Sequence, residues 1–305
     1  MSHDNTNKEL IANILRLKEK RKAVILAHNY QRAEVQDIGD FVGDSLDLSR
    51  KAAEVKVPVI VFCGVHFMAE TASILSPDSL VLLPDAGSGC PMADMITVEQ
   101  LIARKKEIPG ARVVCYVNSP AAVKAESDIC CTSANADNVV RSMGDDRILF
   151  IPDQYLGRYV CTVIKRDMYL WPGYCPTHVG IKAQDIIDQK KKHPGAVALA
   201  HPECRPEVTA VADEVLSTGG MLRYAHTAQA DIMIIATEIG ILHRLKKENP
   251  GKTFVPATGK AVCPDMKKIT LQKVLRALEE MKPEVSVPAD VRERAMSAVN
   301  KMLAL

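Results

Sequence analysis

The chain has 305 residues, of which 47% are hydrophobic and 25% are charged, and its formal net charge is +2. A chain of this length and composition is typical of a globular protein with two or three domains. The sequence has no basic stripe, no acidic tail and no apolar run of the ~20 residues that span a bilayer, which argues against nucleic-acid and membrane partners. The opening residues, MSHDNTNKEL, lack the pattern of an export signal, so we expect a cytoplasmic protein.

A helix is predicted over residues 7–21, where Leu10, Ile14 and Leu17 recur at helical spacing. Short apolar runs of strand length follow, separated by amphipathic segments of helix length. Most of the runs are continuous rather than alternating, which is typical of strands covered on both faces. The predicted strands are 23–30, 57–65, 80–85, 112–118, 127–135, 147–153, 196–203, 231–237 and 253–258. The predicted helices between them include 47–55, 98–108 and 183–192.

Alternating strands and helices predict an α/β fold with parallel sheets. Three of the strands are followed by a polar cluster, in the segments AHNY, YVNS and AHPE. Because parallel sheets bind ligands at the carboxyl ends of their strands, this repetition predicts a triplicated α/β unit whose active ends converge, although repeats this short also arise by chance. Three other strands end on an acid, at Asp85, Asp153 and Glu238, where we expect caps and turns rather than a catalytic triad.

The repeat also predicts where the domains divide. The first α/β unit is expected over residues 1–108, including the N-terminal helix, the second over 109–193 and the third over 194–269. The C-terminal segment 270–305 could complete the first of these units.

The sequence has nine cysteines, an odd number that argues against a disulfide framework. Three of them, Cys90, Cys175 and Cys263, precede proline and recur at nearly equal intervals, one in each predicted unit. Thiolates bind iron–sulfur clusters, and a following proline stiffens the ligand loop. Three thiolates would leave one iron of a [4Fe-4S] cluster open, and an open iron is a Lewis acid that can bind and expel a substrate hydroxyl.

Two alternatives remain open for these cysteines. Buried cysteine is a small hydrophobe, which describes most of the others because they lie inside or beside apolar runs, and the Cys-Pro pairs could be coincidence. His178, three residues after Cys175, would also allow a zinc site with three cysteines and one histidine. The paired C-x₂-C spacing of structural zinc is missing, which makes zinc the weaker alternative.

Each polar cluster has two functional side chains two positions apart, which places both on one face of an extended segment. Histidine beside a phenol or a carboxylate can transfer protons, and tyrosine and asparagine can donate to a carboxylate or phosphate. The ordinary alternatives are a histidine bonded to loop backbone, a surface Pro-Glu turn and an asparagine helix cap. The pairs are His28 with Tyr30, Tyr116 with Asn118, and His201 with Glu203.

Three hydroxyl residues, Ser45, Ser133 and Thr218, lie near predicted helix starts. Their ordinary role would be to cap those helices, and the functional alternative is to bind an anion together with free backbone N–H groups. The sequence contains no G-x-G-x-x-G and no G-x-x-x-x-G-K-[ST] motif, which weakens a dinucleotide-binding or ATPase interpretation.

Together these motifs resemble the quinolinate synthase family, whose members close the pyridine ring in bacterial NAD biosynthesis. The resemblance covers nearly the whole chain, through LAHNYQRAEVQDIGDFVGDSL, YVNS, CTSANA, WPGYCPTHVGI, AHPEC, STGGM and CPDMKKITL. It implies three similar three-layer α/β/α units with parallel sheets around a pseudo-threefold axis, and an active site at the centre.

The resemblance also implies the chemistry: a transferase condenses iminosuccinate (iminoaspartate) with dihydroxyacetone phosphate and releases phosphate and two waters. A [4Fe-4S] cluster bound by Cys90, Cys175 and Cys263 is the implied cofactor, and the enzyme that produces iminosuccinate is an implied transient partner. Some members carry C-x-x-C-x-x-C at the last ligand, whereas this chain has Met266 where the second thiol would stand. Redox switching through such extra thiols is therefore not expected.

By the same resemblance, the catalytic residues are Tyr30, His28 and Glu203. The implied substrate-binding residues are His28, Ser45, Tyr116, Val117, Asn118, Ser133, His201, Pro202, Glu203 and Thr218. Two competing classes remain: a hydro-lyase that uses a similar open cluster on another hydroxy acid, and a zinc-stabilised binding protein without catalysis.

Overall fold

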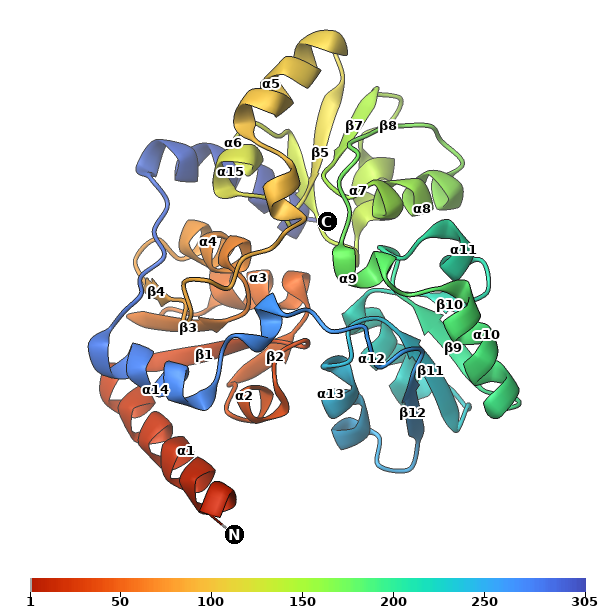
Figure 1. The fold of residues 1–305 in the computed structure, drawn as a ribbon. Coiled ribbons are helices and arrows are strands. Elements are labelled where there is room, and N and C mark those ends of the chain that lie inside the picture. Colours follow the sequence, from red (N-terminus) through yellow and green to blue (C-terminus); the bar gives the residue numbers. More distant parts are fainter. Residues whose placement is uncertain (1) are drawn as a thin grey trace. The chain divides into compact units, whose positions relative to one another are not determined.

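The computed structural model describes residues 2–305, with side chains described from residue 7 onward. These residues form two compact units. The first comprises the chain up to residue 90 together with 263–289, and the second comprises 91–262 together with 290–305. Across the described chain there are three parallel four-stranded sheets, one in the first unit and two in the second (Figure 1).

The three sheets share one topology. Each has the order second, first, third and fourth strand of its own segment, and the strands within it pair in parallel. This repetition confirms the predicted fold class of three similar α/β units. The strands are β1 (Ala23–His28), β2 (Phe41–Gly43), β3 (Val59–Cys63), β4 (Leu80–Leu82), β5 (Arg112–Tyr116), β6 (Ile129–Cys131), β7 (Ile148–Ile151), β8 (Tyr169–Leu170), β9 (Val197–Ala200), β10 (Glu214–Val215), β11 (Ile232–Ala236) and β12 (Thr253–Pro256).

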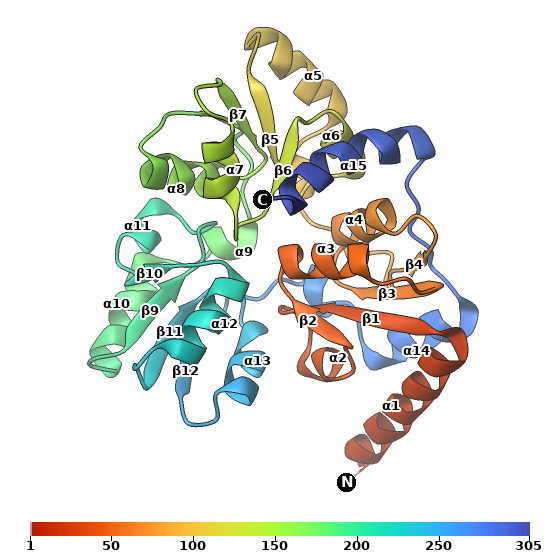
Figure 2. The ribbon, with the colours of Figure 1, turned by 180° about the vertical axis from the view of Figure 1, so that it is seen from behind.

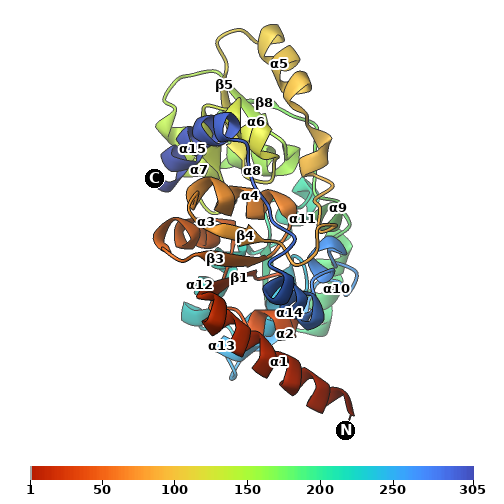
Figure 3. The same ribbon diagram turned by 90° about the vertical axis from the view of Figure 1, so that its left-hand side faces the viewer.

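Helices cover both faces of the first sheet (Figure 3). One face is covered by α3 (Ser45–Glu54) and α4 (His66–Leu75), which pack against each other. The other face is covered by α1 (Ser2–Arg21), α2 (Ala33–Asp37) and α14 (Leu271–Glu280). The sheet is therefore buried on both sides, and all five residues of β3 are inaccessible, as the continuous apolar run predicted.

The second and third sheets are covered in the same way (Figures 1 and 2). On the second sheet, α7 and α8 pack together over one face, and α5 and α6 lie on the other; on the third, α10 and α11 lie opposite α12 and α13. These helices are α5 (Val98–Glu107), α6 (Ala121–Ala125), α7 (Ala136–Ser142), α8 (Gln154–Ile164), α10 (Ala183–Lys192), α11 (Pro206–Thr209), α12 (Thr218–Thr227) and α13 (Ile241–Glu248). Three short helical turns lie in connecting segments: η1 (Ala93–Met95), α9 (Pro176–Val179) and η2 (Asp265–Lys267).

The C-terminal segment divides between the two units. α14 packs against α1 in the first unit, whereas α15 (Ala289–Leu303) lies against the second sheet, where Lys301 Nζ donates to the Asp128 carbonyl at 2.9 Å. The domain boundaries expected at residues 108 and 193 stay a prediction. None of the helices in residues 2–305 combines the length and the apolar character needed to cross a membrane.

Candidate active site

The three predicted polar clusters follow the first strand of each sheet. β1 ends at His28, β5 ends at Tyr116, and β9 ends at Ala200, one residue before His201. This strand pairs with the second strand of its segment on one side and with the third on the other, so the direction of the crossovers reverses at its carboxyl end. Such switch points are where open α/β sheets bind ligands.

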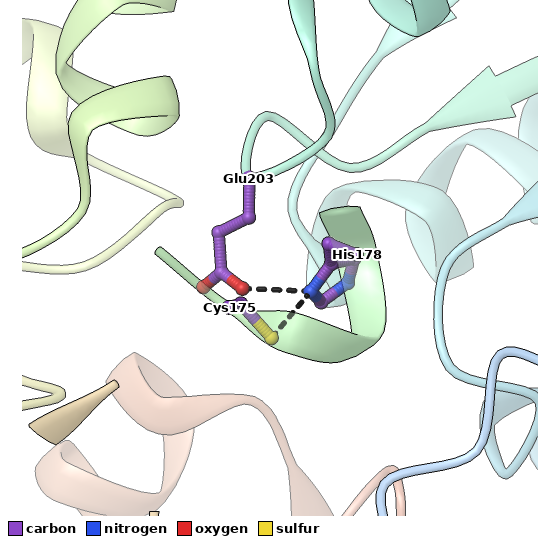
Figure 4. Close-up of side chains that lie close together, drawn as sticks. All are labelled: Cys175, His178 and Glu203. Atoms are coloured by element: carbon purple, nitrogen blue, oxygen red, sulfur yellow. Dashed lines mark hydrogen bonds and ion pairs between the residues drawn. The ribbon is translucent and has the colours of Figure 1, made fainter. Parts of the chain in front are cut away.

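A cluster of cysteine, histidine and glutamate lies in the second unit (Figure 4). Cys175 precedes α9, and the first turn of this helix, which begins at Pro176, brings His178 back toward the Cys175 thiol. His178 Nδ1 lies 3.1 Å from Cys175 Sγ and 2.7 Å from Glu203 Oε2. The three ligand atoms all lie within 4.8 Å of one another, so this group could hold a metal ion.

His178 also connects Glu203 to Thr237, which directly follows β11. His178 Nε2 lies 2.8 Å from Thr237 Oγ1. Because the hydrogen on Nδ1 faces the Glu203 carboxylate, Nε2 of the neutral ring is left to accept a hydrogen bond from the Thr237 hydroxyl. Thr237, His178 and Glu203 thus form a hydrogen-bonded relay. Thr237 was not among the predicted site residues, and His178 was predicted only as an alternative zinc ligand.

Glu203 is the charged centre of this cluster. It is buried, with 3% of its surface exposed, and it accepts the Tyr116 hydroxyl as well as His178. Burial alone would raise the pKa of its carboxyl group, but the imidazoles of His178 and His201 beside it, with hydrogen bonds from His178 and Tyr116, lower that pKa to about 2. Glu203 is therefore a carboxylate at neutral pH. Tyr116, His201 and Glu203, predicted separately, lie together.

His201 joins the same cluster and has a defined tautomer. Its ring stacks on that of His178, with the centroids 4.5 Å apart. Its Nδ1 accepts the Glu203 backbone N–H at 3.3 Å, so the neutral ring carries its hydrogen on Nε2, which lies 3.2 Å from Ser133 Oγ. A cavity of about 200 Å³ opens beside Ser133 and is also lined by Ser217.

Asn118 has a buried side-chain oxygen, Oδ1, for which the described residues supply no hydrogen-bond donor. Asn118 does not cap α6, since Pro120 occupies that position, so the helix-cap alternative is wrong. The adjacent Val117 is fixed by its N–H, which donates to the Cys131 carbonyl at 2.9 Å. Because a buried acceptor without a donor is destabilising, Asn118 Oδ1 is suited to accept a hydrogen bond from a ligand.

The hydroxyls of Ser45 and Thr218 lie at the first residues of α3 and α12. The caps of these helices are instead the neighbouring side chains of Asp44 and Ser217, so the ordinary capping role expected for the two hydroxyls is wrong. Ser133 does not cap α7 either, since the residue before that helix is Asn135.

The three strand-end acids have local roles, as predicted. Asp85 and Glu238 each accept the backbone N–H two residues further on, at 2.8 and 2.7 Å. Asp153 is the N-cap of α8 and is fully buried. Burial and the nearby charge of Glu203 hold the pKa of Asp153 well above its usual range.

His28 and Tyr30 lie in the first unit. Their rings meet edge to face, with centroids 4.7 Å apart at 79°, and both side chains are buried. His28 Nδ1 accepts the Tyr30 backbone N–H at 3.1 Å, so the loop-backbone bond expected as the ordinary alternative is present together with the ring contact. Lys267 Nζ donates to the Tyr30 carbonyl, which ties η2 to this loop.

The three Cys-Pro segments have similar local structures. Cys90 lies a few residues before η1, Cys175 directly before α9, and Cys263 two residues before η2. All three are half-buried, as is Cys161 in α8. The remaining cysteines are fully covered and match the small-hydrophobe interpretation; burial raises the pKa of Cys63, for example, to about 12. Cys90 and Cys263 belong to the first unit and Cys175 to the second.

Comparison with known proteins covers all of these residues. Over residues 12–304 the chain matches the family described as "Quinolinate synthetase A protein". A quinolinate synthase from Dehalococcoides mccartyi is 58% identical over 297 residues, which are 97% of this chain and 98% of the relative. Quinolinate synthases from Methanoregula boonei and Thermodesulfovibrio yellowstonii are 55% and 53% identical over 292 and 296 residues, which are 96% and 97% of this chain and 97% and 98% of the relatives.

Proposed function

The chain belongs to the quinolinate synthase family, and on that premise we propose that it condenses iminosuccinate with dihydroxyacetone phosphate to give quinolinate, phosphate and two waters. The product carries the pyridine ring of NAD. We propose that the enzyme is a transferase and that it acts in the cytoplasm. The observation that carries the proposal is the buried relay of Thr237, His178 and Glu203, because dehydration and ring closure both require positioned proton donors and acceptors.

We assign Cys90, Cys175 and Cys263 as the ligands of a [4Fe-4S] cluster. Support comes from their donor chemistry and placement: each is a half-buried thiol in a loop that ends in a short helical turn, unlike the fully buried cysteines of the sheets. When bound, the cluster would supply one open iron as a Lewis acid for a substrate hydroxyl. Met266 is buried and its sulfur accepts from Gln31 Nε2 at 3.4 Å, so it packs where a switching thiol stands in some relatives.

The relay is proposed to move the protons of dehydration. Glu203 keeps Nδ1 of His178 protonated, so Nε2 can take a proton from Thr237 and return it. Tyr116 donates to the other Glu203 oxygen, which holds the carboxylate in place and adds a second acidic hydroxyl. Glu203 thus takes part in the proposed base catalysis through His178: its donors hold the pKa of its carboxyl group low, and the carboxylate orients the ring whose Nε2 takes the proton.

Substrate binding is proposed for the polar groups around this relay. Asn118 Oδ1 would accept from a substrate N–H or O–H, which would remove the destabilisation of its buried, unpaired state. His201 and Ser133 would donate to a carboxylate beside the cavity at Ser133. Backbone groups at Val117 and Pro202, and the helix-start hydroxyls of Ser45 and Thr218, complete the proposed set.

His28 and Tyr30 are the proposed proton-transfer pair of the first unit, since an imidazole against a phenol can relay a proton to an enolising substrate. The substrates also suggest a partner. Imines hydrolyse in water, so direct transfer of iminosuccinate during a transient contact with the enzyme that produces it would protect the substrate.

The test is anaerobic purification followed by assay with dihydroxyacetone phosphate and freshly made iminosuccinate. We expect a brown protein that releases quinolinate and phosphate in equal amounts. A brown protein that dehydrates another hydroxy acid but forms no quinolinate would favour the hydro-lyase. A colourless protein with one zinc and no activity would favour the zinc-stabilised binding protein.

A further inference from the structure

Lys124 in α6 is fully buried, with 0% of its surface exposed. Lysine is rare in protein interiors, because removing its ammonium group from water is costly unless nearby groups compensate. The family motifs assign it no role, and the chemistry proposed above does not use it. A buried cation six residues after Asn118 therefore requires a physical reason.

The Lys124 ammonium group donates to the carbonyl oxygen of Ser119, which is also fully buried. Ser119 then bonds back to the segment before it: its hydroxyl donates to the Tyr116 carbonyl at 2.9 Å and its N–H to the Val117 carbonyl at 2.8 Å. Lys124 thus anchors a short chain of hydrogen bonds that fixes segment 116–119.

Segment 116–119 carries two groups of the proposed site. The Tyr116 hydroxyl donates to Glu203, and Asn118 holds its unpaired Oδ1 in a buried position. Tyr116 is the last residue of β5, and Asn118 follows it, at the carboxyl edge of the second sheet. A small shift of the Ser119 carbonyl would therefore displace two groups together. One is the Tyr116 hydroxyl, which donates to the Glu203 carboxylate, and the other is Asn118 Oδ1, the proposed acceptor for the ligand.

A buried thiol pair lies within the electrostatic influence of Lys124. Cys115 and Cys130 face each other in the register of β5 and β6, and both are fully buried. Burial would raise the pKa of Cys115, but a hydrogen bond from Cys130 and the charge of Lys124 lower it to about 7. The ammonium group therefore has a backbone carbonyl as its hydrogen-bond partner, and its charge lowers the pKa of a buried thiol.

We infer that Lys124 is a positioning residue: its buried ammonium group locks segment 116–119 so that Tyr116 meets Glu203 and Asn118 Oδ1 faces the substrate. The inference deepens the proposed function, because it concerns how that same site is held in shape. Lys124 acts through Tyr116 and Asn118 and does not itself touch substrate.

The test compares Lys124→Met, which keeps the aliphatic stem and removes the charge, with Lys105→Met. Lys105, in α5, is the matched control: its Nζ also donates to a backbone carbonyl, that of Glu126 at 3.0 Å, but not to segment 116–119. We expect K124M to lower kcat/KM for quinolinate formation about 100-fold, the scale of a misplaced catalytic group. K105M should retain activity within about twofold, since surface substitutions away from a site have small effects.

Two further readouts separate positioning from general destabilisation. Binding of the product quinolinate by calorimetry should weaken at least about tenfold in K124M, while iron content and the visible spectrum stay at the wild-type level. In a double-mutant cycle with Tyr116→Phe, the losses should be far from additive, because both changes affect one segment. If K124M does not fold, Ser119→Ala removes the hydroxyl bond to Tyr116 and takes its place in the cycle.

Unchanged kcat/KM in K124M, or additive losses in the cycle, would overturn the positioning role. Failure of the proposed function would look different, because the wild-type chain itself would then form no quinolinate. Quinolinate binding in wild type, K124M and K105M would still test the positioning of the segment in that case.

Discussion

At the scale of single residues, the central group is the Glu203 carboxylate. Tyr116 and His178 occupy its two oxygens, and the ring of His201 stacks on that of His178. These donors keep the group ionised in a buried position, so its charge orients the hydrogens of the neighbouring side chains. The relay to Thr237 depends on that orientation.

Glu203→Gln should therefore disable the relay. A neutral amide no longer fixes the hydrogen on Nδ1 of His178, so Nε2 loses its defined role toward Thr237. We expect kcat for quinolinate formation to fall by roughly 10²–10⁴-fold, the range for loss of general acid–base catalysis. Glu207→Gln, an exposed glutamate in α11, is the matched control and should stay near wild-type activity. Near-wild-type turnover in E203Q would remove Glu203 from the catalytic group.

The same carboxylate predicts a pH dependence of stability. The pKa of Glu203 is lowered in the folded protein from 4.5 to about 2, so ionised Glu203 stabilises the fold above the unfolded value. That contribution is lost as pH falls through the window from 4.5 to about 2. The difference in Tm between wild type and E203Q should be constant above pH about 5 and shrink below it. A difference that grows on acidification would contradict the assigned direction.

At the scale of elements, the site residues lie at the carboxyl ends of the strands. The loop that ends at Cys175 is fixed there by hydrogen bonds and close packing. Trp171 Nε1 donates to the Met95 carbonyl at 2.9 Å, and the Gln154 N–H donates to the Gly173 carbonyl at 2.9 Å. A Cβ at Gly173 would lie 2.5 Å from the Pro152 carbonyl oxygen, closer than real contacts allow. Glycine is thus required where this loop passes β7.

Gly173→Ala should shift that loop and with it Cys175. We expect a loss of about 1–3 kcal/mol of unfolding free energy, the usual effect of overpacking, together with reduced iron content after anaerobic purification. Gly251→Ala is the control, because a Cβ there meets nothing within 4 Å. Chemical denaturation and iron analysis measure the two effects. Equal stability of G173A and G251A would show that the loop yields without cost.

All nine apolar runs that the sequence marked as strands form strands, because continuous Val/Ile/Leu runs are the local signal of a sheet covered on both faces. The three missed strands are β2, β8 and β10, which have only two or three residues and carry no periodic pattern. The helix α1 begins at Ser2 rather than at residue 7.

The site was predictable where chemistry was local. Pairs of functional residues two positions apart, such as His201 with Glu203, form a pattern that can be recognised in the sequence. A single hydroxyl residue at the end of a strand forms no such pattern. Thr237 was missed because its partner His178 is 59 residues away, a pairing that only the sheet topology creates. The feature that could have identified Thr237 is its position directly after β11, the strand that pairs with β9.

At the scale of the whole molecule, the three cysteines of the Cys-Pro segments are distributed over the two compact units: Cys90 and Cys263 belong to the first and Cys175 to the second. Each unit has its own sheet core and its own part of the proposed chemistry. His28 with Tyr30 belongs to the first unit, and the relay around Glu203 to the second. On this account the proposed function depends on the three cysteines of the Cys-Pro segments.

The most direct measurement is therefore the iron and sulfide content, with the visible spectrum, of anaerobically purified wild type and single Cys→Ala variants. We predict about four irons per chain in the wild type and loss of the cluster in C90A, C175A and C263A alike. C161A, which removes a half-buried thiol outside the Cys-Pro trio, should keep the cluster. A cluster that survives any of the first three substitutions, or a wild-type chain that binds one zinc and no iron, would contradict the account.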